Sequence, residues 1–121
     1  MSKKLLNLLP LVFLVGCAST QKYAWNGYDN NLYAYYKNPA EKEKFIERLK
    51  AAIVKAEQTG NIPPGIYAEY GYLCYEGQNY KDAMAYFQKE YDLWPESQPF
   101  MQKMILNAKN MLAKSENKEP A

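Results

Sequence analysis

Residues 64–95 read PGIYAEYGYLCYEGQNYKDAMAYFQKEYDLWP, and this stretch decides the fold. In each half of it, apolar and aromatic residues recur every three or four positions, which is the spacing of one helix face. Gly77-Gln78-Asn79 between the halves is typical of a turn, and Pro95 closes the second run because proline cannot continue a helix. The stretch therefore predicts a helical hairpin, with helices over 66–76 and 80–93.

The spacing of this hairpin matches the tetratricopeptide pattern, a repeat of about 34 residues that reads W-x-x-L-G-x-x-Y, then A-x-x-x-F, then P. With Pro64 as the first position every spacing is intact, although tyrosine replaces Trp and Leu, and cysteine replaces Tyr. Gly71 and Ala83 are small where two helices must approach closely, and Cys74 is expected as a buried apolar residue rather than a reactive thiol. The predicted repeat core consists of Tyr67, Tyr70, Gly71, Cys74, Ala83, Phe87 and Pro95.

Two further helices flank the hairpin. Asn38 is a suitable N-cap, Pro39 suits the first helical position, and Glu41 can reach back to the cap. Gly60 is a typical helix stop, so a helix is predicted between these signals. The apolar stripe of that helix is Phe45, Leu49, Ala52, Ile53 and Ala56. The last helix is predicted over 100–113, and its apolar stripe is Met101, Met104, Ile105, Ala108 and Leu112.

One such hairpin cannot bury its own faces, so neighbouring units must cover it. Shifting the register back by one repeat places a short helix after Asp29 or Asn30, and shifting it forward leaves the last helix without a hairpin partner. The predicted fold is therefore all-α, a tetratricopeptide-like stack of two helical hairpins plus a C-terminal capping helix over residues 29–114. Residues 115–121 are polar and are predicted to be a disordered tail.

The start of the chain predicts a secretion signal. Lys3 and Lys4 precede an apolar run over residues 5–15, which is too short to span a bilayer, because spanning takes roughly 20 apolar residues. The run ends in Leu14-Val15-Gly16-Cys17, which resembles a bacterial lipobox.

The lipobox resemblance implies that residues 1–16 are removed as a signal peptide. It also implies that the thiol of Cys17 carries diacylglycerol and that the new amino group is acylated. Residues 17–28 would then form the lipidated cysteine, a tether and an aromatic turn. Two acyl chains anchor a protein stably where one does not, so membrane lipid is the first predicted partner. Ala18 follows the cysteine instead of Asp, and by resemblance this favours the periplasmic face of the outer membrane.

Composition argues against several function classes. Lys3 and Lys4 account for the formal net charge of +2, so the remaining chain has no basic excess and no nucleic-acid partner is predicted. The chain has no histidine, which removes the commonest general base and most zinc sites. We therefore expect a protein that is not an enzyme and that has no metal or cofactor.

A partner-binding groove is predicted from the tetratricopeptide resemblance, because the first helix of each hairpin lines the concave face in that family. The predicted groove residues are Tyr72, Tyr75, Gln102 and Lys109, with Gly65, Ala68, Ala34 and Leu106 beside them. Tyrosines at such positions suit a peptide or a partner helix. The alternative is that Tyr72 and Tyr75 pack under the N-terminal segment. Tyr80 and Tyr91 are expected in the core, and Tyr86 on a flank.

Glu90 falls at an inward-facing position where small alanine is usual. A carboxylate there must be hydrogen-bonded or paired, or its pKa rises. We expect a structural tie to tyrosine hydroxyls, a lysine or Arg48 rather than a catalytic acid.

The motifs WNGYDNNLYAYYK, PPGIYAEYGYL and FQKEYDLWPES..FM, together with the lipobox, resemble a family of small bacterial lipoproteins of unknown function. Members tend to be encoded beside a curli-secretion-channel-like lipoprotein. This implies a partner lipoprotein or a secretion-channel-like protein, and hence an adaptor or assembly factor for an envelope or secretion complex. The alternative is a lipoprotein that binds peptidoglycan or another glycan through N-terminal aromatic residues, Trp25 and Tyr28.

Overall fold

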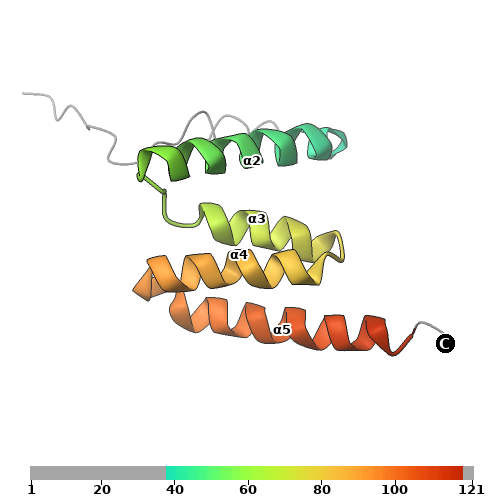
Figure 1. Cartoon of the computed structure of the whole chain (residues 1–121). Coiled ribbons are helices and arrows are strands. Elements are labelled where there is room, and N and C mark those ends of the chain that lie inside the picture. Colours follow the sequence, from blue (N-terminus) through green and yellow to red (C-terminus); the bar gives the residue numbers. More distant parts are fainter. Residues whose placement is uncertain (1–37, 119–121) are drawn as a thin grey trace, which may run out of the picture.

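The computed structural model describes residues 38–118, and the regular structure in this range is entirely helical (Figure 1). The predicted all-α class is therefore confirmed. The elements are the 3-10 helix η1 (Pro39–Glu41), α2 (Lys42–Thr59), α3 (Ile66–Glu76), α4 (Tyr80–Leu93), the 3-10 helix η2 (Pro95–Ser97) and α5 (Gln98–Glu116).

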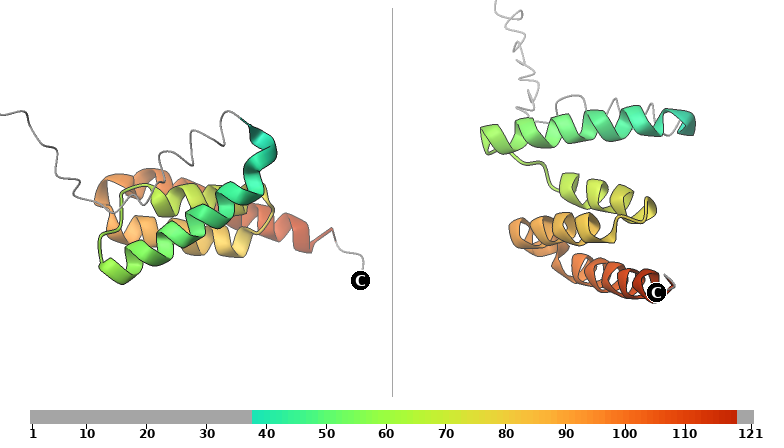
Figure 2. Two further views of the ribbon diagram at one scale, coloured as in Figure 1. Left: turned by 90° about the horizontal axis from the view of Figure 1, so that it is seen from above. Right: turned by 45° about the vertical axis from the view of Figure 1, so that its right-hand side comes forward.

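The helices form a layered stack in chain order. Successive helices run in opposite directions, and α4 lies between α3 and α5 and packs closely against both (Figure 1). α2 crosses α3 obliquely and packs on it less extensively (Figure 2). α3 and α5 therefore run in the same direction on either side of α4.

The hairpin begins and ends where the sequence predicted. The side chain of Asn79 caps α4 by accepting a hydrogen bond from the backbone N–H of Asp82 at 3.3 Å, and it donates one to the Asp82 carboxylate at 2.7 Å. α4 ends at Leu93, and Pro95 begins η2. Local turn and cap chemistry is thus sufficient to define these two helices.

The ends of the flanking helices differ in detail from prediction. Asn38 caps the start by accepting a hydrogen bond from the backbone N–H of Ala40 at 3.2 Å, but the first turn is the 3-10 helix η1. The carboxylate of Glu41 lies 3.8 Å from Lys44 Nζ instead of reaching back to the cap. Gly60 ends α2 with a left-handed φ of 72°, as its sequence position predicted.

α5 is longer than the predicted 100–113. It begins at Gln98, because Pro99 fits a first helical turn, whose N–H groups have no intrahelical partner. It continues through Glu116, where the hydroxyl of Ser115 donates to the carbonyl of Leu112 at 2.7 Å. Residues 115 and 116 therefore belong to the helix and not to a disordered tail.

Two apolar clusters hold the stack together. The first joins α2 to α3 and includes the stripe predicted for α2 except Ala56, which is buried outside this cluster. The buried members of the cluster are Phe45, Leu49, Ala52, Ile53, Ile66, Tyr67, Tyr70 and Leu73. The second joins α4 to α5, with Tyr80, Ala83, Phe87, Met101 and Ala108 buried. Cys74 of α3 packs against both clusters, so the two cores are continuous through α3.

Residues 1–37 and 119–121 lie outside the described part of the chain. The predictions for the signal peptide, Cys17, the tether, Trp25, Tyr28, the short helix after Asp29 or Asn30, and Ala34 fall there. Within residues 38–118, no helix combines the length and apolar character that crossing a membrane requires.

Candidate functional site

An apolar groove with a volume of about 390 Å³ lies between α3 and α5, with α4 at its floor. Its lining residues are Gly65, Ala68, Glu69, Tyr72, Phe87, Phe100, Met101 and Met104. Apart from the carboxylate of Glu69, these residues present methyl, thioether and aromatic groups.

Helical spacing explains how the groove forms. Tyr72 lies four residues after Ala68 and three after Glu69, so all three side chains lie on one side of α3. Phe100 and Met104 do the same on α5. Between these walls the floor is closed by Phe87, which is only 1% exposed. Phe100 is 63% exposed, so the groove opens to solvent beside a large apolar side chain.

Of the four predicted groove residues, Tyr72 lines this groove, whereas Tyr75, Gln102 and Lys109 do not. Tyr72 lies in the groove wall with 46% of its surface exposed. Tyr75 is half-buried and packs edge-on against Tyr80, with ring centroids 5.4 Å apart. Gln102 and Lys109 are exposed on α5, but neither lines the groove.

The apolar stripe predicted for α5 does pack on α4, but Gln102 and Lys109, which were predicted beside it, do not line this groove. Met101 and Ala108 are buried against α4, and this contact fixes the rotation of α5 about its axis. Helical periodicity then puts Phe100 and Met104 on the flank toward α3, and Gln102 and Lys109 on the opposite flank. Sequence reasoning missed Phe100 and Met104 as groove residues, although an aromatic residue and a methionine four positions apart were a visible signal.

Glu69 is the one charged residue of the groove. It is half-buried, and burial, followed by the negative charge of Glu76, raises the pKa of its carboxyl group. Within residues 38–118 its carboxylate makes no hydrogen bond or ion pair. Glu76, about two turns further along α3, is paired with Lys42 at 3.4 Å.

Most of the predicted repeat core is buried. Tyr67, Tyr70, Gly71, Ala83 and Phe87 are buried. Cys74 is half-buried, and burial raises the pKa of its thiol. Pro95 is exposed and acts only as the stop after α4. Tyr86, expected on a flank, is half-buried, and its ring packs edge-on against Tyr70 with centroids 4.5 Å apart.

Glu90 is fully buried and ties three elements together. Its Oε1 accepts a 2.7 Å hydrogen bond from the backbone N–H of Gly65 and a 3.4 Å one from the hydroxyl of Ser97. Glu90 thus holds two segments against α4: Gly65, which immediately precedes α3, and η2, which contains Ser97. The predicted structural role stands, but Gly65 and Ser97 replace the expected tyrosines, lysine or Arg48. Burial raises the pKa of Glu90, and its hydrogen bonds oppose that rise.

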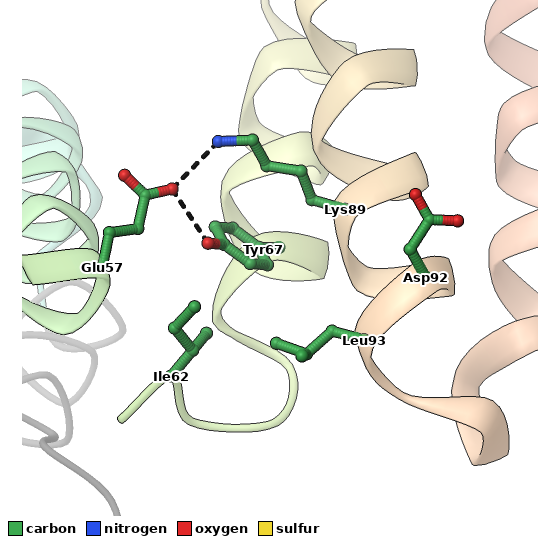
Figure 3. A pocket seen from close by; sticks show the side chains of 6 residues that line it. All are labelled: Glu57, Ile62, Tyr67, Lys89, Asp92 and Leu93. Atoms are coloured by element: carbon green, nitrogen blue, oxygen red, sulfur yellow. Dashed lines mark hydrogen bonds and ion pairs between the residues drawn. The ribbon is translucent and has the colours of Figure 1, made fainter. Parts of the chain in front are cut away.

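A second, shallower depression of about 410 Å³ lies where α2, α3 and α4 meet (Figure 3). Oε1 of Glu57 accepts hydrogen bonds from the hydroxyl of Tyr67 at 2.8 Å and from Nζ of Lys89 at 2.9 Å. The hydrogen bond from Lys89 is the main cause that lowers the pKa of Glu57. These polar groups satisfy one another, so this depression is a tie between helices. The sequence carries no signal for it, since Glu57 and Lys89 are 32 residues apart.

The described residues offer little for metal chemistry. Within residues 38–118 no three His, Cys, Asp or Glu side chains are grouped in a way that could hold a metal ion.

A family model for a domain of unknown function, DUF4810, matches residues 22–104. The chain belongs to this family. The DUF4810 match includes α2, α3, α4 and the groove residues Phe100, Met101 and Met104, but ends before Lys109. The comparisons of the DUF4810 chain with curated proteins and with solved structures gave no match.

Proposed function

We propose that this protein is a lipid-anchored, non-enzymatic adaptor or assembly factor of an envelope or secretion complex. It would bind a partner lipoprotein or a secretion-channel-like protein through the groove between α3 and α5. The observation that carries the proposal is the exposed apolar groove beside Phe100, because exposed apolar grooves of this kind mark sites of protein association.

The arrangement of α3 to α5 supports a tetratricopeptide-like scaffold. A Cβ atom on Gly71 would lie 2.7 Å from Cδ1 of Phe87 and 3.3 Å from the carbonyl oxygen of Ala83. The three residues at the small and aromatic positions of the repeat pattern are thus in contact, as in a repeat hairpin. α5 covers the open side of α4, which is the role proposed for the capping helix.

The proposed location rests on the sequence. The basic start, the apolar run and Leu14-Val15-Gly16-Cys17 support cleavage before Cys17 and its acylation. Two or more acyl chains would hold the protein stably on the periplasmic face of the outer membrane. A Cys17→Ala chain, labelled in cells with an alkyne fatty acid, should lose both the label and the membrane association of the parent chain.

The groove is tested by placing a photo-crosslinking amino acid at Tyr72 or at Phe100 in intact cells. Both positions should capture the same envelope protein, because both lie at the groove. Val54 provides the matched control, since it is an apolar side chain 52% exposed on α2, outside the groove. Capture of only lipid or bulk periplasmic protein from Tyr72 and Phe100, or equal capture from Val54, would contradict the proposal.

A further inference from the structure

We infer that the partner segment in this groove presents apolar side chains together with one lysine or arginine that pairs with Glu69. This inference rests on the proposed function and specifies the chemistry of the partner. The groove supplies the apolar part of the contact through Tyr72, Phe100 and Met104.

The charge part follows from the pairing of acids along α3. Glu76 already has a cation, because Nζ of Lys42 lies 3.4 Å from its carboxylate. Glu69 lies seven residues, or about two turns, earlier in the apolar wall and has no such partner within the described residues. The chain therefore neutralises the acid outside the groove and leaves the acid inside the groove available.

The surroundings of Glu69 favour a cation over a neutral group. A half-buried carboxylate next to apolar side chains has lost part of its hydration, and the charge of Glu76 adds repulsion. A bound ammonium or guanidinium group relieves both effects and forms a charge-assisted hydrogen bond. An acidic partner segment would meet like charge at the same place and be rejected.

The side chains at the rim fit an adaptable apolar contact. Met104 is half-buried, flexible and polarisable, and such residues accommodate apolar groups of different shapes. Tyr72 adds a rigid aromatic face with a hydroxyl group. By contrast, the cation of Lys89 in the other depression is already paired with Glu57 at 2.9 Å, and Asp92 there accepts a hydrogen bond from Gln88 at 2.8 Å.

The experiment uses the full-length chain in cells, with the photo-crosslinker at Tyr72 and Glu69 changed to Lys or to Gln. Glu116→Lys is the matched control, since it makes the same charge change at the far end of α5, where residues are exposed. We expect Glu69→Lys to reduce the yield of the crosslinked protein by about tenfold, Glu69→Gln by a few-fold, and Glu116→Lys to leave it unchanged. Circular dichroism melts of the purified variants check that each chain folds.

Mass spectrometry of the crosslinked peptide should find a lysine or arginine within about one helical turn, or roughly four residues, of the attachment site. Replacing that residue by Glu should restore capture by Glu69→Lys. Unchanged capture by a folded Glu69→Lys chain, or an attachment site without a basic residue, overturns this inference and leaves the adaptor proposal standing. Crosslinking to residues 18–37 of the same chain or to a second copy also overturns it. Absence of capture by the parent chain would instead contradict the proposed function itself.

Discussion

Gly71 of α3 lies directly against the ring of Phe87 of α4, so that a Cβ atom at position 71 would be 2.7 Å from Cδ1 and 2.8 Å from Cε1. The ring cannot easily move aside, because Phe87 is 1% exposed and is a buried member of the cluster that joins α4 to α5. The glycine is therefore required for close approach of the two helices of the hairpin. Its backbone φ is not in the left-handed region, so conformational freedom is not the reason.

Gly71→Ala should destabilise the fold. Alanine is favoured over glycine in a helix by about 1 kcal/mol, but overpacking a tight core typically costs about 1–3 kcal/mol. We expect overpacking to prevail and the free energy of unfolding, measured by urea denaturation, to fall by about 1 kcal/mol. The control is Gly77→Ala, where the nearest atom to the new Cβ would be 3.4 Å away and φ is −77°. If the new methyl group clashes with the ring, the double variant Gly71→Ala/Phe87→Leu should lose less stability than the sum of the losses in the two single variants. Strictly additive losses would contradict a clash between these two residues.

The ion pair between Lys89 and Glu57 should contribute little to the free energy of unfolding, and its contribution should depend on salt concentration. Their side chains are 48% and 39% exposed, and an exposed pair contributes at most about 1 kcal/mol. Lys89→Met should therefore lower the free energy of unfolding by less than about 1 kcal/mol at pH 7, and this difference should shrink in 1 M salt. Lys103→Met, on the exposed surface of α5, is the control.

The pH dependence of the same tie has a definite sign. The pKa of Glu57 is lowered below 4.5 in the folded protein, so the unfolded chain binds the proton more tightly. The contribution of the tie is present above pH 4.5 and is lost as pH falls through the folded pKa. Urea melts should show a larger difference between the parent and Lys89→Met chains at pH 7 than at pH 3. An equal difference at both values would show that Lys89 acts through its contact with the rings of Tyr67 and Tyr86 instead.

How far the sequence predicts the structure depends on whether the cause is local. The bounds of α3 and α4 follow from Asn79, Gly77 and Pro95, which act within one turn of the chain, and they were predicted correctly. The rotation of α5 follows from the burial of Met101 and Ala108 on α4, which the apolar stripe of the sequence predicted. The lining of the groove by Phe100 was not predicted, because it depends on which flank of α5 faces α3, a tertiary relationship.

In the candidate site, too, features with a local cause were predicted and features that depend on tertiary packing were not. Tyr72 was predicted to line the groove from its position on α3, and it does. The residue that donates a hydrogen bond to Glu90 could not be predicted, because the donor is the backbone N–H of Gly65 and a backbone group cannot be recognised from the pattern of side chains. Glu57 and Lys89 meet only because α2 folds across the hairpin, which is a tertiary relationship.

Cys74 should react slowly in the folded protein. Its thiol is half-buried between the two clusters, and burial raises the pKa of the thiol above its usual value of 9.0. Since the thiolate is the reactive form, alkylation by iodoacetamide at pH 8 should be at least about tenfold slower than in the chain unfolded in guanidinium chloride. The Cys17→Ala chain isolates this rate, because Cys74 is then the one remaining cysteine. Equal rates in the folded and unfolded chains would contradict the packing of Cys74 in the core.

Glu90 should make the protein less stable as pH rises above about 4.5. Burial raises the pKa of its carboxyl group above the ordinary 4.5, so the folded state binds the proton more tightly than the unfolded state does. Its stabilising contribution is fully present below pH 4.5 and is lost as pH rises through the folded pKa.

Glu90→Gln keeps an oxygen that can accept the hydrogen bond from the N–H of Gly65, but its side chain cannot ionise. The free energy of unfolding of Glu90→Gln should therefore fall less between pH 4.5 and 7 than that of the parent chain. Glu90→Ala should lose about 1–3 kcal/mol at every pH in this range, because the N–H of Gly65 and the hydroxyl of Ser97 lose their acceptor. Urea melts at several pH values give the free energy of unfolding of the parent, Glu90→Gln and Glu90→Ala chains. The pKa of Glu69 is also raised, so a Glu69→Gln chain measured in the same way shows how much of the pH dependence comes from Glu69. If the parent and Glu90→Gln chains change in parallel with pH, the buried carboxyl group does not titrate in this range.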